Sequence, residues 1–379
     1  MKTVAIFSGF YLPFLGGIER YTYNIVQKFI DKGYNVVIVT SQHDKDLPTK
    51  EEFDHLKIYR LPIRKIWKNR YPFPLKNERY KQLISDITSE PIDYYVVNTR
   101  FQLPALLGAQ LAKKAGKEAL VLEHGTTYLT LNNSLLDSIL HRIEHFLVKK
   151  IKKNTKTFYG VSKEATEWLK TFGIEAKGVI YNAIDLDDFE KYFSPKLSEK
   201  IVISYSGRLQ AKFKGVEMLL EAFSELSKER NNLELKIAGD GPIYSEMIRK
   251  YSQENIQFLG HISHEDVMRL NNHSDIFVLM SKIEGFSTSM LEAALMNNVI
   301  VTTNVGGATE LIPNQEYGYV IKDDKETLLK TLKLIVDDTK KMAEIQKRVH
   351  DRVVENFNWN KSIESFEKAF VELEKIEIN

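Results

Sequence analysis

The residues best placed to do chemistry are two glutamates, Glu284 and Glu292, on either side of a predicted loop-to-helix turn. The apolar run 275–280 ahead of them is rich in β-branched and aromatic residues and predicts a buried parallel strand. Ser287 or Thr288 suits the N-cap of the following helix, whose first amides favour phosphate. Gly285 lets a ligand approach the backbone closely. A phosphate site with a carboxylate on each side suits a nucleotide that carries a second polyhydroxyl group, although two glutamates at this spacing also occur by chance.

Two cations, Arg208 and Lys214, follow a second predicted strand, residues 201–205. Apolar residues from Val216 onward repeat at helical spacing, so the cations flank the start of a helix. A planar guanidinium and a compact ammonium suit the two charges of a diphosphate, but lysines ahead of a helix are commonly only solvated. Gly241 lies in another strand-to-helix turn of the same half. The second half of the chain therefore predicts a series of turns suited to an anionic ligand.

The first half offers fewer specific residues. Gly16 and Gly17 follow the predicted strand 2–7 at the start of a helix, where backbone can approach a phosphate or an acceptor. They do not form the G-x-G-x-x-G dinucleotide fingerprint, and a glycine pair is often only a turn. His124 follows the predicted strand 120–123, at a carboxyl end where open α/β sheets bind ligands. A single histidine there is more often structural.

The stretch E-G-F-S-T-S-M-L-E-A at 284–293 resembles the donor site of GT-B fold glycosyltransferases of family four, the retaining group 1 glycosyl transferases. The resemblance implies that Glu284 holds the transferred sugar, Glu292 the ribose hydroxyls, and His124 the sugar from the opposite domain. It implies catalytic roles for Glu284, His124, Arg208 and Lys214. The donor-binding set that it implies is Gly16, Gly17, Arg208, Lys214, Gly241, His261, Ile262, Glu284, Gly285, Phe286, Ser287 and Glu292.

Alternating strands and helices over 379 residues predict an α/β chain of two doubly wound, Rossmann-like domains. The resemblance implies the GT-B arrangement, in which the domains face each other across a cleft. We expect an acceptor-binding domain at 1–185, completed by the C-terminal helix 361–379. The segment 186–360 is expected to bind the nucleotide-sugar donor.

Composition excludes several classes of protein. The chain has no cysteine, which excludes disulfides and thiolate sites, and its 43% hydrophobic and 27% charged residues are typical of a soluble globular protein. The apolar run near the N-terminus is broken by Pro13 and lacks a small-residue cleavage site, so it predicts a buried strand rather than a signal peptide. No segment approaches the ~20 apolar residues of a membrane-spanning helix.

Charge is distributed unevenly along the chain. Residues 1–178 hold 28 Lys+Arg and 18 Asp+Glu, a balance of +10, whereas the remaining residues balance at −8. The segment 57–81 interleaves cations, aromatics and prolines that break regular structure. The segment 141–156 overlaps a predicted amphipathic helix, 138–153, with lysines at its end. Both segments suit an anionic membrane surface, and a solvated loop or nucleic acid is the alternative for the first. We see no nucleic-acid module and expect no nucleic-acid partner.

The expected reaction is retaining transfer of a sugar from a UDP- or GDP-sugar to a glycan or lipid-linked acceptor, in synthesis of a cell-surface polysaccharide or glycolipid. The resemblance implies no required cofactor or metal; Asp185/Asp187 and Asp44/Asp46 are acidic loop pairs that could suggest one. We expect a cytoplasmic protein, peripheral on the inner face of the membrane. The alternatives are an NAD-dependent oxidoreductase, a same-fold epimerase or phosphorylase, and a non-catalytic nucleotide-sugar sensor.

Overall fold

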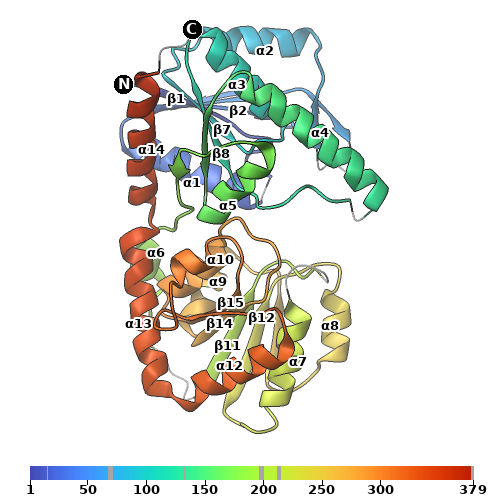
Figure 1. The fold of residues 1–379 in the computed structure, drawn as a ribbon, viewed down its shortest axis with the longest axis vertical. Coiled ribbons are helices and arrows are strands. Elements are labelled where there is room, and N and C mark those ends of the chain that lie inside the picture. Colours follow the sequence, from blue (N-terminus) through green and yellow to red (C-terminus); the bar gives the residue numbers. More distant parts are fainter. Residues whose placement is uncertain (15, 67–70, 132, 196–199, 211–214, 377–379) are drawn as a thin grey trace. The chain divides into compact units, whose positions relative to one another are not determined.

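The structure is a computed structural model that describes residues 1–379 except 15, 67–70, 132, 196–199, 211–214 and 377–379. It divides into two compact units, one of Met1–Tyr181 with Trp359–Asn379 and the other of Asn182–Asn358. Each unit is a parallel sheet with helices on its faces, so the predicted α/β class is confirmed (Figure 1). The chain passes from the first unit to the second after Tyr181 and returns after Asn358. Both positions lie within a few residues of the boundaries expected after 185 and before 361.

Unit 1 is built on an eight-stranded sheet with the order β10-β9-β8-β7-β1-β2-β4-β3, parallel except for the edge strand β3. Its strands are β1 (Thr3–Phe7), β2 (Asn35–Ser41), β3 (Lys50–Phe53), β4 (Leu56–Leu61), β7 (Tyr94–Asn98), β8 (Ala119–Glu123), β9 (Thr157–Gly160) and β10 (Gly178–Val179). The central strands are buried from end to end, as expected of parallel strands covered on both faces.

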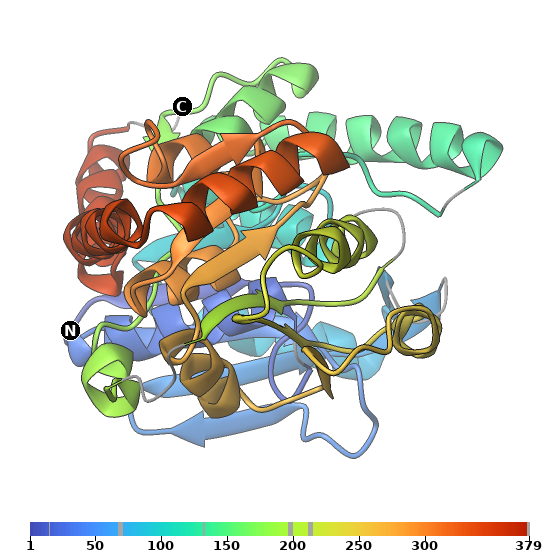
Figure 2. The same ribbon diagram turned by 90° about the horizontal axis from the view of Figure 1, so that it is seen from below.

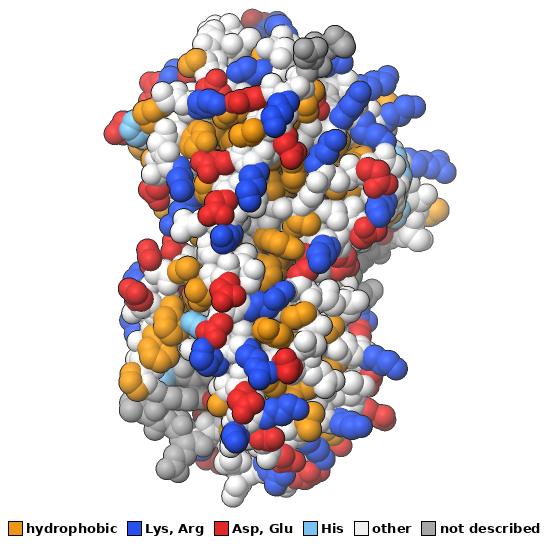
Figure 3. All heavy atoms as spheres, turned by 60° about the vertical axis from the view of Figure 1, so that its left-hand side comes forward, with side chains coloured by type: hydrophobic (Ala, Val, Ile, Leu, Met, Phe, Trp, Pro, Cys, Tyr) orange, Lys and Arg blue, Asp and Glu red, His pale blue; other side chains and the backbone are white. Residues whose placement is uncertain are grey.

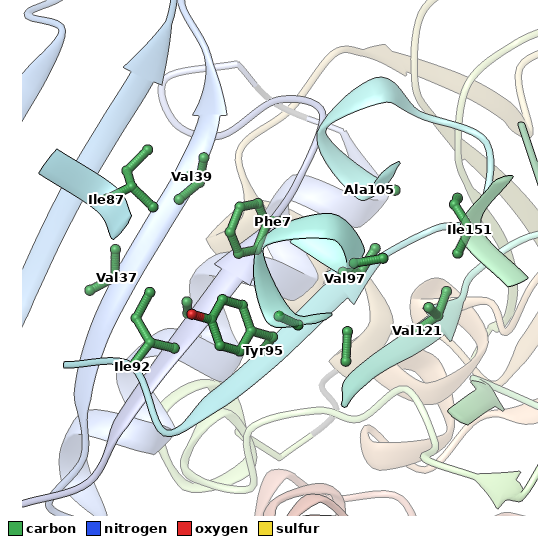
Figure 4. Close-up of a cluster of buried hydrophobic side chains, with 14 of the residues drawn as sticks. Phe7, Val37, Val39, Ile87, Ile92, Tyr95, Val97, Ala105, Val121 and Ile151 are labelled. Atoms are coloured by element: carbon green, nitrogen blue, oxygen red, sulfur yellow. The ribbon is translucent and has the colours of Figure 1, made fainter. Parts of the chain in front are cut away.

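The helices of unit 1 are α1 (Gly17–Asp31), α2 (Glu78–Ser89), α3 (Leu103–Lys114), α4 (Ser134–Lys152), α5 (Lys163–Leu169) and α14 (Trp359–Glu374). One face of the sheet presents alternate side chains such as Phe7, Val97 and Val121 to a core that includes Ala105 of α3 (Figure 4). Gly108 keeps α3 close to this face, because a side chain there would collide with Phe7 and Val97. Strand alternation thus creates two apolar faces, and α3 covers one of them.

The last helix, α14, covers the other face of the same sheet beside α1. Phe370 stacks on Tyr94 of β7 with ring centroids 4.1 Å apart and lies 5.9 Å from Phe29 of α1. Ser362 also donates a hydrogen bond to the carbonyl of Tyr181. The C-terminal helix is therefore part of the first unit's core, although nearly the whole chain separates it from β1 (Figures 1 and 2).

The segment predicted to be irregular, 57–81, contains regular structure. Strands β5 (Ile63–Ile66) and β6 (Tyr71–Pro74) form a separate antiparallel pair. The prediction was wrong because prolines are tolerated on a two-stranded ribbon, where each strand is an edge. Helix α4 also begins earlier than predicted, since Asn133 caps it by accepting a hydrogen bond from the amide of Leu136.

Unit 2 has a wholly parallel six-stranded sheet with the order β13-β12-β11-β14-β15-β16. Its strands are β11 (Ile201–Ser206), β12 (Leu233–Ala238), β13 (Ile256–Gly260), β14 (Ile276–Leu279), β15 (Val299–Thr303) and β16 (Tyr319–Ile321). Its helices are α6 (Asp187–Tyr192), α7 (Val216–Leu226), α8 (Tyr244–Lys250), α9 (His264–Asn272), α10 (Thr288–Leu295), α11 (Ala308–Leu311), α12 (Lys325–Asp337) and α13 (Thr339–Asn356). Helix α7 packs against α12, and α10 packs against α13. Among the described residues, no helix is both long and apolar enough to cross a bilayer.

Candidate active site

The sheet of unit 2 contains a point where its winding reverses. The chain leaves β11 outward through β12 and β13, then returns to the other side of β11 with β14. In open α/β sheets the turns at the carboxyl ends of two such strands diverge and leave a crevice that binds ligands. Arg208 follows β11 directly, and Glu284 lies in the loop that follows β14. The topology therefore brings these two predicted residues to the same edge of the sheet.

Glycines let the turns at this edge pack backbone against backbone. A Cβ at Gly239 would collide with the carbonyl oxygen of Gly207, and a Cβ at Gly241 would collide with that of Leu209. Gly215, the residue before α7, has a φ of +61° and rests against the carbonyl of Met280 at the end of β14. A side chain at any of these positions would separate the turns, so the glycines allow the backbones at this edge of the sheet to pack closely.

A buried tyrosine of β11, Tyr205, interacts with the backbone of Arg208 and is influenced by the charge of Glu284. Burial, and after it the negative charge of Glu284, raise the pKa of the Tyr205 hydroxyl. The same hydroxyl donates a hydrogen bond of 3.3 Å to the backbone carbonyl of Arg208. The side chain of Arg208 is exposed and Glu284 is half-buried. The backbone of Arg208 and the charge of Glu284 thus both act on one tyrosine hydroxyl at this edge of the sheet.

Helix α10 begins at this edge with the predicted cap. Ser287 accepts from the amide of Met290 at 3.4 Å, and its hydroxyl lies 2.9 Å from that of Ser289. The side chain of Asn182 donates to the carbonyl of Phe286 at 2.9 Å and fixes the residue before the cap. The first amides of a helix have no carbonyl partner within it, so the start of α10 offers donors to an anion.

Glu292 is buried on the next turn of α10 and has an unforeseen neighbour, His264. One ring nitrogen of His264, Nδ1, lies 3.6 Å from the carboxylate of Glu292, and the other, Nε2, lies 3.2 Å from that of Asp188. His264 is the first residue of α9, directly after the N-cap Ser263. Asp188, His264 and Glu292 are far apart in the sequence, and no spacing pattern marks them as a group.

The remaining predicted donor residues of unit 2 occupy neighbouring turns. Gly241 follows β12, and His261 and Ile262 follow β13, with His261 exposed and Ile262 half-buried. A hydrogen bond of 2.7 Å from the amide of Gly239 to the carbonyl of Gly260 joins these two turns. The ring of Phe286 is buried against that of Phe357 and belongs to the core, so a ligand would meet Phe286 mainly through its backbone. Lys214 lies outside the described residues.

His124 lies at the carboxyl edge of the other sheet, in unit 1. Its Nε2 is 3.3 Å from the side-chain oxygen of Asn98, whose amide donates to Thr22 at 2.7 Å. The ring also packs edge-on against Tyr21 at 4.7 Å. Burial lowers the pKa of His124 to about 3, so the imidazole is neutral at physiological pH. Gly16 and Gly17 lie at the start of α1, with Gly16 as its N-cap and both exposed.

A buried charge cluster supports the loop that carries His124. Arg100 is fully buried, 2.7 Å from Glu123 and 3.1 Å from Glu144. Glu123 accepts from the amide of Gly125 at 2.7 Å, and Glu144 accepts from that of Leu129 at 2.8 Å. Burial is the main cause that raises the pKa of Glu144, to about 7. One guanidinium therefore ties the loop after β8 to α4.

The predicted acidic pairs have structural roles. Asp185 accepts from the amide of Asp187 at 3.2 Å, and Asp44 accepts from that of Asp46 at 3.1 Å, as turn-forming aspartates do. Within the described part of the chain, no group of three or more histidine, cysteine or acidic side chains is arranged to hold a metal ion.

Two family models match the chain. Residues 15–188 match Glycosyltransferase Family 4, and residues 187–352 match Glycosyl transferases group 1. An uncharacterized glycosyltransferase of Methanocaldococcus jannaschii is 26% identical over 97% of this chain and 98% of its own length. The phosphatidylinositol N-acetylglucosaminyltransferase GPI3 subunit of Saccharomyces cerevisiae is 27% identical over 94% of this chain and 80% of its own.

Solved structures show the same fold. Sucrose-phosphate synthase of Thermosynechococcus elongatus superposes with a TM-score of 0.75 at 17% identity, covering 98% of this chain and 99% of that one. HepE of Anabaena, solved with UDP and glucose, has a TM-score of 0.72 at 16% identity, covering 98% and 100%. The family matches also count against the oxidoreductase alternative. The chain is a glycosyltransferase of the GT-B fold and belongs to family 4.

Proposed function

We propose that this enzyme transfers a sugar, with retention, from a UDP- or GDP-sugar to a glycan or lipid-linked saccharide. The observation that carries the proposal is the carboxyl edge of the unit 2 sheet, to which the topology brings Arg208, Glu284 and the start of α10 beside glycine turns that pack backbone against backbone. The anion site suits a diphosphate, and the carboxylates suit hydroxyls. Structures of HepE with UDP-glucose support a nucleotide-sugar as donor.

In the proposed reaction the diphosphate gains negative charge as the bond to the sugar breaks. Arg208, Lys214 and the first amides of α10 would bind this charge, and donors that are oriented before the reaction lower its barrier. Positive charge from side chains and a helix start can serve here without a metal ion. The close backbone contacts of Gly239 and Gly241 would help to hold the turn that carries Arg208 in place.

The carboxylates would hold the sugars at either end of the diphosphate. Glu284, half-buried beside Tyr205, would accept hydrogen bonds from the transferred sugar, and Glu292 would accept them from the ribose. The remaining donor residues, Gly241, His261, Ile262, Gly285 and Phe286, would contribute mainly backbone. His124 is neutral, so it would exchange a hydrogen bond with the sugar rather than bring a positive charge to it.

In this proposal neither Glu284 nor Glu292 attacks the sugar. The acceptor attacks from the face that the leaving group departs, so the configuration at the anomeric carbon is retained. The acceptor would be met by unit 1, where Gly16 and Gly17 start α1. The name of the GPI3 subunit, a phosphatidylinositol N-acetylglucosaminyltransferase, supports a lipid-linked acceptor. We place the reaction in the cytoplasm, at the inner face of the membrane, in synthesis of a surface polysaccharide or glycolipid.

The direct test is to incubate the protein with a panel of UDP- and GDP-sugars and lipid-linked or free saccharides. Mass spectrometry would identify the product, and the proton coupling constant at the new anomeric carbon would give its configuration. We expect one donor to yield a product with the donor's own configuration. An inverted product would refute retention, and binding of a nucleotide-sugar without transfer or hydrolysis would indicate a sensor.

A further inference from the structure

Helix α4 carries an apolar stripe that the described residues of its own unit leave largely exposed. Leu135, Ile139 and Phe146 are 78%, 55% and 56% exposed, and Leu136 and Ile143 are exposed beside them. At 3.6 residues per turn, these five side chains fall within one stripe about 100° wide. The adjacent side of the helix packs onto unit 1 through Leu140, Leu147, Val148 and Ile151. The apolar face of α4 is therefore wider than the part that packs onto unit 1, and the remainder is exposed.

The charges on α4 are separated according to sign. Its two acidic residues face unit 1: Glu144 binds Arg100, and Asp137 accepts from the amide of Leu131 at 2.7 Å. Lys152 also serves the fold, since it donates to the carbonyls of Phe172 and Gly173.

The cations that border the stripe are Arg142, Lys149 and Lys150, all outside these contacts with unit 1. The ammonium of Lys150 lies 4.5 Å from the ring centroid of Phe146, within the stripe. The outer side of α4 thus combines a large apolar surface with positive charge alone.

Other exposed apolar residues do not form such a surface. Phe53, Leu334 and Val371 are equally exposed but occupy three different elements. On the face that carries α13 and α14, acidic and basic side chains are interspersed (Figure 3), and several are paired, such as Lys361 with Glu364. Single exposed apolar residues are normal for a folded protein, whereas a contiguous patch indicates a partner.

We propose that α4 binds the surface of an anionic lipid bilayer, with its apolar stripe among the headgroups and acyl chains and its cations on lipid phosphates. A helix with this division of charge and apolar surface is the form that lies in a membrane interface. The amino-terminal part of α4 extends outward from the rest of unit 1 in both ribbon views (Figures 1 and 2), and a bilayer can cover such a projecting helix.

The structure also reduces the part of the predicted segment 57–81 that is available to a membrane. In 57–81, Tyr59 and Arg60 are buried, Arg60 pairs with Glu51, and Lys57 lies 2.9 Å from Glu90. The charges at the start of this segment are therefore neutralised within the fold. The second predicted segment was 141–156. The surface that we assign to lipid begins before it, at Leu135, and is mainly apolar.

The test uses the full chain and vesicles of phosphatidylcholine, with and without phosphatidylglycerol. We expect co-sedimentation with the anionic vesicles that weakens as salt is added. The variant Leu135→Gln/Ile139→Gln/Phe146→Gln should lose about tenfold or more in vesicle affinity. The matched control Phe53→Gln/Leu334→Gln/Val371→Gln should bind like the parent. Both variants are compared with the parent for thermal unfolding, since all six sites are exposed.

Because the chain has no cysteine, a single introduced thiol can report contact with lipid. An environment-sensitive dye on Ile139→Cys should shift to the blue with anionic vesicles, and the same dye on Val371→Cys should not. Equal binding by both triple variants, or no shift at Ile139→Cys, would overturn the proposal. So would a parent dimer that the first triple variant converts to monomer, since the stripe would then be a contact between copies. No nucleotide is needed in these measurements, so their failure is distinct from failure of the proposed transfer reaction.

Discussion

The carboxyl edges of the two sheets hold their polar groups in different ways. In unit 2, the candidate site is built from turns that follow separate strands, with an exposed Arg208 and a half-buried Glu284 beside close backbone contacts. In unit 1, the loop that carries His124 is supported from below by the fully buried Arg100 and its two glutamates. The difference indicates that polar residues in unit 2 act on the ligand, while those beneath His124 act on the protein itself.

The largest effect is expected when the buried charge cluster of unit 1 is broken, which tests its structural role. Arg100→Ala leaves Glu123 and Glu144 buried without their cation and should lower the free energy of unfolding by about 3–5 kcal/mol. Urea unfolding followed by circular dichroism would measure the loss. Arg142→Ala, on the exposed side of α4, is the control and should change stability by less than about 0.5 kcal/mol. A folded Arg100→Ala protein of parental stability would contradict the structural role.

The complementary change in unit 2 is Glu284→Gln, which should affect transfer and leave stability and nucleotide affinity nearly unchanged. We expect the transfer rate to fall by about 10²–10³, the loss seen when one group that stabilises a transition state is removed. Steady-state kinetics with the identified donor would measure it. Glu229→Gln, an exposed glutamate 2.7 Å from Lys333, is the control and should react at the parental rate.

Arg208→Ala should weaken nucleotide binding itself. Loss of charged hydrogen bonds to the diphosphate is worth about 1.5–3 kcal/mol, so the Kd for UDP or GDP should rise by about tenfold to a hundredfold. The Kd for the corresponding nucleoside, which has no phosphate, should not change. Calorimetry would compare the two ligands, with Arg230→Ala as a control because that arginine pairs with Asp337 at the surface. Equal losses for nucleotide and nucleoside would place Arg208 away from the phosphates.

The pH dependence of stability should come partly from the unit 1 cluster. The pKa of Glu144 is raised to about 7, so the folded protein holds its proton more tightly than the unfolded chain does. This contribution is complete below the ordinary pKa and is lost as the pH rises through about 7, by about 1–3 kcal/mol. Unfolding measured from acid to neutral pH should show the decline in the parent and a flatter profile in Glu144→Gln. Parallel profiles would show that the pKa of Glu144 is the same in the folded and the unfolded chain.

The smallest expected effect concerns His264, which we expect to position Glu292. His264→Ala should raise the donor KM by about threefold to tenfold with little change in kcat, since it removes one polar neighbour of the carboxylate. The effect should disappear with a donor whose ribose lacks its hydroxyls, and His264→Gln should restore part of it. His273→Ala, at the other end of α9, is the control. A KM change that persists with the deoxyribose donor would refute the positioning role.

Sequence alone was enough for the fold and the family, because both depend on local patterns. Apolar runs identified the central strands, and the stretch around Glu284 combined a strand, a glycine and a capped helix within a few residues. His264 beside Glu292 could not be foreseen, because its partners Asp188 and Glu292 meet it only through the folding of three separate helices.

The same limit applies to unit 1. Arg100, Glu123 and Glu144 come from different elements, and each alone resembles an ordinary surface charge. Helical periodicity predicts α4 but cannot show that only part of its apolar face is covered, because covering depends on tertiary packing. The hairpin of β5 and β6 is not predicted, because proline usually interrupts regular secondary structure.

The most direct test of the central claim is a crystal structure of the protein soaked with UDP or GDP. We predict the diphosphate against Arg208 and the start of α10, with the ribose hydroxyls on Glu292. A nucleotide bound at any other place, with this edge of the unit 2 sheet unoccupied, would contradict the assignment of the donor site.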